Sequence, residues 1–68
     1  MDTIYKVIEI IGSSEKSWED AAKSAVESAS KSLKELRVAE VKELDLSIDE
    51  GNKIIFRTKL KVSFKYVP

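Results

Sequence analysis

The chain has 68 residues, with 12 basic and 12 acidic side chains and a formal net charge of +0. It contains no cysteine and no histidine, which excludes disulfides, thiolate nucleophiles, the usual zinc sites and a histidine general base. Balanced charge gives no reason to expect nucleic acid or an anionic membrane as a partner. A chain this short buries only about 60% of its unfolded surface, so self-association is the remaining route to stability.

The first two expected elements are a β-strand and an amphipathic helix. The run IYKVIEII predicts a strand at about 3–11, ended by Gly12-Ser13-Ser14. Ser17, with Asp20 three residues later, has the spacing of a capping box and predicts a helix over about 17–35. Apolar residues follow at three- and four-residue steps, and most are alanine: Trp18, Ala21, Ala22, Ala25, Val26, Ala29, Leu33 and Leu36.

The second half of the chain predicts a long β-hairpin. Its strands are expected at about 37–49 and 53–66, with Glu50-Gly51-Asn52 as the turn. Residues of the last strand alternate between an apolar and a basic face. A strand of roughly 14 residues is about 45 Å long, whereas a compact globule of this size has a diameter of about 28 Å. The hairpin is therefore expected to curl round the helix or to extend into neighbouring copies.

Charge pairing predicts the register of this hairpin. When Asp49 faces Lys53, Asp45 faces Arg57, and Glu43 faces Lys59 in turn. Leu46 then faces Phe56, on the apolar side that we expect to pack against the helix. The apolar phase changes between Val41 and Leu44, which predicts a β-bulge at about 41–43 and places Glu40 opposite Lys61 and Ala39 opposite Val62.

The sequence offers little catalytic chemistry. None of its serines has a histidine to activate it, so we do not expect an enzyme. Asp45 and Asp49 share a strand face and are weak candidates for a hard cation, and cross-strand pairing with Arg57 and Lys53 is the alternative. The basic face of the last strand has no interleaved aromatic platform for nucleic acid. No apolar run approaches the roughly 20 residues that span a bilayer, and no signal-peptide pattern opens the chain, so a cytoplasmic protein is expected.

Two apolar residues, Val38 and Ile55, fall on the charged face of the hairpin. Single exposed apolar residues are common. Because the domain needs partners, we instead expect these two at a subunit contact or beside a bound ligand.

The order of these elements resembles that of the dodecins, a family of small flavin-binding proteins. The matching stretches are YKVIEIIGSS, SWEDAAKSAVESASKSLKELR, RVAEVKEL and RTKLKVSF. The resemblance implies a single α+β domain over 1–68, a β-α-β-β subunit whose three-stranded antiparallel sheet wraps around one helix. It further implies a hollow shell of twelve copies, with flavin (riboflavin or FMN) bound between subunits for storage or sequestration.

The chain departs from the family pattern at two ligand-binding positions. Val38 stands where the family has an aromatic residue that stacks on the flavin, and Arg57 stands where a glutamine contacts its polar edge. These two are the position-matched candidates for ligand binding, and their identities predict weak flavin affinity. Arg57 either binds an anion or is neutralised by Asp45. The alternative function is a ligand-free or cation-binding (calcium-type) assembly of the same fold.

Overall fold

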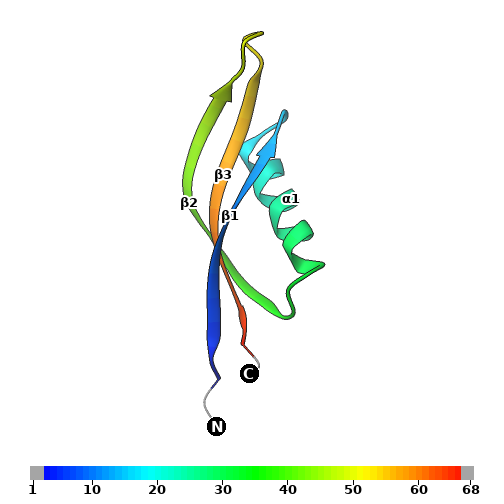
Figure 1. Cartoon of the computed structure of the whole chain (residues 1–68), viewed down its shortest axis with the longest axis vertical. Coiled ribbons are helices and arrows are strands. Elements are labelled where there is room, and N and C mark those ends of the chain that lie inside the picture. Colours follow the sequence, from blue (N-terminus) through cyan, green and yellow to red (C-terminus); the bar gives the residue numbers. More distant parts are fainter. Residues whose placement is uncertain (1–2, 67–68) are drawn as a thin grey trace.

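A computed structural model describes residues 3–66 of the chain. Strand β1 (Tyr5–Ser14) is followed by helix α1 (Trp18–Ser30), then by β2 (Leu36–Ile48) and β3 (Ile54–Lys65). The three strands form one antiparallel sheet in the order β1-β3-β2, so β3 is central and both other strands are edges. Figure 1 shows the helix lying along one side of this long, twisted sheet. The predicted α+β class and β-α-β-β order are confirmed.

The helix begins where the sequence predicts and ends early. Ser17 is the N-cap, and its hydroxyl accepts a hydrogen bond from the Asp20 amide at 3.0 Å. The helix ends at Ser30 rather than at 35, so the predicted C-terminal end is wrong. After Ser30 the amide of Ser32 bonds the carbonyl of Ala29 in a tighter turn, and Glu35 takes a left-handed φ of 52°. This reversal turns the chain back into β2.

Strand β1 is longer than predicted, because Gly12, Ser13 and Ser14 belong to it rather than to a loop. Gly12 is buried against α1. A Cβ atom at Gly12 would lie 2.1 Å from the carbonyl oxygen of Ala21 and 2.8 Å from the Cβ of Ala25. The glycine therefore permits close approach of the helix to the strand, and it does not form a turn.

The register of the β2–β3 hairpin is as predicted. Asp45 lies opposite Arg57, Glu43 opposite Lys59 and Glu40 opposite Lys61. The register shifts between Val41 and Glu43, which confirms the bulge at 41–43; a second shift lies between Leu36 and Val38. At the turn, Asp49 accepts hydrogen bonds from the amides of Gly51 and Lys53, both at 2.9 Å.

The core of one subunit is small. The fully buried side chains of the described residues are Ala21 of α1 and Thr58, Leu60 and Val62 of β3. The helix packs mainly on β1 and β3 and little on β2. Leu46 is therefore 45% exposed, and the prediction that it packs against the helix as part of a buried core is wrong. The subunit measures 53 × 20 × 17 Å, which confirms that the hairpin extends beyond a compact globule. Within residues 3–66 no helix is long and apolar enough to cross a membrane.

Candidate ligand-binding site

The sheet face that points away from α1, here called the outer face, carries both position-matched residues. Arg57 and Asp45 form a two-pronged ion pair, with Nε to Oδ1 and Nη2 to Oδ2 distances of 2.7 Å each. Lys59 and Glu43 follow on the next row, 4.0 Å apart. Together with Ile11 of β1, these four side chains line a small depression of about 180 Å³.

The Arg57–Asp45 pair favours the charged form of both groups. The hydrogen bonds from Arg57 lower the pKa of Asp45, and the same bonds raise the pKa of Arg57. Two parallel bonds of this length occupy both carboxylate oxygens and two of the guanidinium nitrogens. The sequence left two roles open for Arg57, anion binding and neutralisation by Asp45. Within one subunit Arg57 is paired with Asp45.

Val38 lies on the same outer face but far from Arg57. It pairs with Ser63, whereas Arg57 is six positions away along β3, a separation of about 20 Å at 3.3 Å per residue. Its side chain is 62% exposed, and Val7 lies across Ser63 on β1, also exposed. Within one subunit, Val38 and Arg57 therefore lie on separate parts of the outer face.

The two weak metal candidates are engaged in other bonds. Asp45 holds Arg57, and one oxygen of Asp49 accepts the two turn amides. Over the described range 3–66 there is no group of three or more acidic, histidine or cysteine side chains placed to hold a metal ion. A single subunit does not fit a calcium ion, which takes 6–8 oxygen ligands, and Val38 offers no ring to a flavin.

Trp18 is the feature that the sequence pattern did not reveal. Its indole Nε1 donates a hydrogen bond to the carbonyl oxygen of Asp45 at 3.0 Å. The indole ring packs edge-on against Phe56 with ring centroids 5.1 Å apart. The backbone carbonyl of Trp18 accepts a hydrogen bond from the Thr58 hydroxyl at 2.9 Å. Trp18 thus fixes the backbone of Asp45 behind the Arg57 pair. The three- and four-residue spacing of apolar residues placed Trp18 on the apolar face of the helix, but it did not predict a hydrogen bond to Asp45.

Ile55 and Val38, the two apolar residues on the charged face, both lie on the outer face but at different places. Ile55 is half-buried and borders a shallow depression with Ser13, Ser14 and Asp20 near the start of the helix. Val38 is at the other end of the sheet. The structure therefore separates them, and their expected place at a subunit contact stays a prediction.

Together, the fold and the outer face define a class of protein: a small α+β protein with an elongated open sheet and a row of cross-strand ion pairs on the side away from its helix. The family model described as Dodecin matches residues 4–67. The chain belongs to the dodecin family.

Two proteins similar to this chain illustrate the family. It is 52% identical over 66 residues to the calcium dodecin of Mycobacterium tuberculosis, covering 97% of this chain and 93% of that protein. It is 35% identical over 65 residues to the dodecin of Thermus thermophilus, covering 96% and 94%.

Solved structures agree with the fold. The crystal structure of the Mycobacterium tuberculosis protein, described as a calcium chelating immunodominant antigen with a novel calcium-binding site, has a TM-score of 0.89 and covers 96% of this chain and 93% of that chain. Dodecin from Streptomyces davaonensis, at 25% identity, also has a TM-score of 0.89 and covers 100% of both chains. The chain therefore shares its β-α-β-β fold with both of these structures.

Proposed function

We propose that the chain is the subunit of a homododecameric, non-enzymatic binding protein that holds a small molecule or ion between subunits and has weak affinity for flavin. The observation that carries this proposal is the incompleteness of the site. Val38 and Arg57 share the outer face, yet about 20 Å of β3 separates them. A ligand that touches both positions needs a second copy of the chain.

Weak flavin affinity follows from the chemistry of Val38 and Arg57. A valine has no π face, and stacking of a planar heterocycle on an aromatic ring contributes about 1–3 kcal/mol. Loss of this stacking raises the dissociation constant for flavin by roughly ten- to hundred-fold. Arg57 adds little attraction for the polar edge of flavin while both of its bonded nitrogens are held by Asp45.

Calcium is the second candidate ligand. It is favoured by the 52% identity to a protein named calcium dodecin. Asp45 and Asp49 are both engaged within the subunit, so a calcium site in this chain would need carboxylates from more than one copy.

Solution mass and two titrations test the proposal. Light scattering should give about twelve times the subunit mass of 7.7 kDa, and a folded monomer at micromolar concentration refutes the assembly. Riboflavin or FMN fluorescence is then followed on adding protein. Quenching only at tens of micromolar or above supports weak flavin binding, whereas nanomolar quenching contradicts it. Calorimetry with Ca²⁺ on the same sample decides the second candidate, and absence of binding up to millimolar Ca²⁺ excludes it.

A further inference from the structure

Trp18 contacts the residues around Arg57 from the opposite side of the sheet. Phe56 precedes Arg57 on β3 and packs against the indole ring. Thr58 follows Arg57, and its hydroxyl donates a hydrogen bond to the Trp18 carbonyl. Asp45 lies opposite Arg57 on β2, and its backbone carbonyl accepts the indole Nε1–H bond at 3.0 Å. Trp18 therefore fixes the backbone on both strands that carry the Arg57–Asp45 pair.

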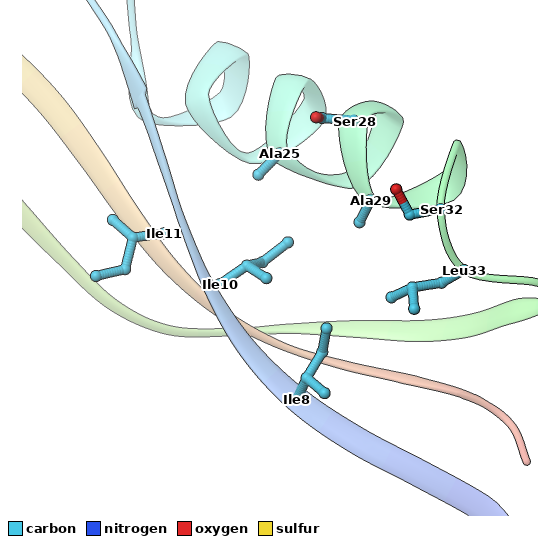
Figure 2. Close-up of a pocket in the computed structure, with 8 residues that line it drawn as sticks. All are labelled: Ile8, Ile10, Ile11, Ala25, Ser28, Ala29, Ser32 and Leu33. Atoms are coloured by element: carbon cyan, nitrogen blue, oxygen red, sulfur yellow. The ribbon is translucent and has the colours of Figure 1, made fainter.

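The start of α1 is anchored by hydrogen bonds, whereas its C-terminal half borders an open groove. Ser17 caps the helix by accepting a bond from the Asp20 amide, which places Trp18 as the first helical residue. Towards the other end, a groove of about 410 Å³ separates α1 from β1, and Figure 2 shows Ile10 and Ala29 on its two sides. Trp18 is therefore a donor at the anchored end of the helix.

Strand β2 is the element that needs such a donor. It is an edge strand, the helix packs little on it, and its register shifts between Val41 and Glu43, just before Asp45. A bulged strand bends and twists more than a regular one. Aspartate has a short side chain with few torsions, so the place of its carboxylate follows the place of its backbone. The indole bond therefore also determines how the Asp45 carboxylate meets Arg57.

The Arg57–Asp45 pair decides which charge the small depression on the outer face admits. The depression is lined by the cations Arg57 and Lys59 and by the carboxylates Asp45 and Glu43. Asp45 holds Arg57 through both oxygens at 2.7 Å, whereas Glu43 and Lys59 are 4.0 Å apart. An anion gains Arg57 as a partner only by displacing Asp45, because a guanidinium bonds phosphate through the same paired N–H groups. A neutral or cationic ligand needs no such displacement.

We propose that Trp18 is a positioning residue of the outer-face site: it holds the backbone of Asp45, keeps Arg57 paired, and thereby makes the site reject anions such as phosphate groups. Trp18 acts through Asp45 and lies on the other side of the sheet from the ligand. This inference rests on the ligand-binding role proposed above and adds the charge class that the site excludes. Removal of the indole N–H should loosen Asp45 and make Arg57 available to phosphate.

Phosphate titrations of matched variants test this role. Trp18→Phe keeps a ring against Phe56 and removes the indole N–H, whereas Asp45→Asn removes the charged partner of Arg57. The probe is the Arg57 Nε–H signal in a ¹⁵N-correlated NMR spectrum, followed as inorganic phosphate replaces chloride at constant ionic strength. Arg37→Lys assigns this signal, because Arg37 and Arg57 are the arginines of the sequence. The apparent dissociation constant for phosphate should fall about three- to tenfold from wild type to Trp18→Phe, the size of one neutral hydrogen bond, and further in Asp45→Asn.

Thr58→Val is the matched control. It removes the other hydrogen bond of Trp18 and leaves the Asp45 carbonyl bonded, so its phosphate response should equal that of the wild type. Equal responses of Trp18→Phe and Thr58→Val overturn the positioning role. So does a wild-type signal that moves with phosphate as far as that of Asp45→Asn. A monomeric wild type refutes the proposed function, yet the titration still tests Trp18, because all the bonds concerned lie within one subunit.

Discussion

Replacing Gly12 by alanine tests the closest contact in the subunit. The new Cβ atom would lie 2.1 Å from the Ala21 carbonyl oxygen, and real Cβ atoms essentially never approach a neighbour within 3.0 Å. The helix would have to move outwards by about 1 Å, because a backbone oxygen cannot rotate away as a side chain can. That movement also stretches the Ser14–Asp20 hydrogen bond of 2.6 Å and the Thr58–Trp18 bond of 2.9 Å.

The expected cost of Gly12→Ala is about 3 kcal/mol, at the upper end of the range for overpacking. The free energy of unfolding of a chain this size is only about 3–10 kcal/mol. With a urea m-value of about 1 kcal/mol per molar, the unfolding midpoint should fall by about 3 M. Trp18 is the single tryptophan and lies at the helix start, so its fluorescence reports the transition.

Gly51→Ala is the matched control for this measurement. The nearest atom to a Cβ at Gly51 is a side-chain oxygen 3.5 Å away, and the glycine has no positive φ. Its free energy of unfolding should stay within about 0.5 kcal/mol of the wild-type value when both are measured at one protein concentration. If Gly12→Ala is as stable as Gly51→Ala, the close packing of α1 on β1 is refuted.

Three further substitutions test the outer face and its support. Val38→Trp should tighten FMN binding by about ten- to hundred-fold, measured by fluorescence quenching, because it supplies the missing stacking surface. Asp45→Asn should flatten the acid dependence of the urea midpoint. The pKa of Asp45 is lowered in the folded subunit, so its pairing with Arg57 stabilises the fold above the unfolded pKa of about 3.9 and is lost as pH falls through the folded value. Thr58→Val should cost about 1 kcal/mol in urea unfolding, because it removes the buried bond to the Trp18 carbonyl.

Each of these outcomes has a result that would contradict it. A Val38→Trp assembly of normal mass that quenches FMN no better than the wild type places the ligand elsewhere. Equal acid dependence for Asp45→Asn and the wild type, between pH 5 and 2, shows that the pair with Arg57 does not persist. A Thr58→Val subunit that is as stable as the wild type shows that its hydroxyl is not held by the helix.

Local rules predicted much of this fold because the relevant information is local. The Ser17–Asp20 spacing gave the helix start, since capping depends on residues three apart. The hairpin register followed from charges that meet across a short turn, as the Asp45–Arg57 pair shows. The bulge near Lys42 followed from a single change of apolar phase.

The candidate site was only partly accessible from the sequence. Arg57 and its partner Asp45 were paired correctly, because cross-strand register is a regular count along two strands. The bond from the Trp18 indole to the Asp45 carbonyl was not predicted, since it joins residues 27 positions apart on different elements. Whether Val38 and Arg57 form one site depends on how a second copy of the chain is placed, and residue spacing within one chain does not predict that placement.

Amino-acid order alone thus determined the element types, the pairing of β2 with β3 and the start of the helix, all of which depend on neighbours in the chain or on a fixed repeat. The pairing of β1 with β3 came from the structure. Only the tertiary structure decided where α1 ends, why Gly12 lies inside a strand, and that the helix leaves β2 uncovered. These features depend on how closely two elements approach in space. That distance is set by packing among residues remote in sequence, and a periodic pattern within one element carries no information about it.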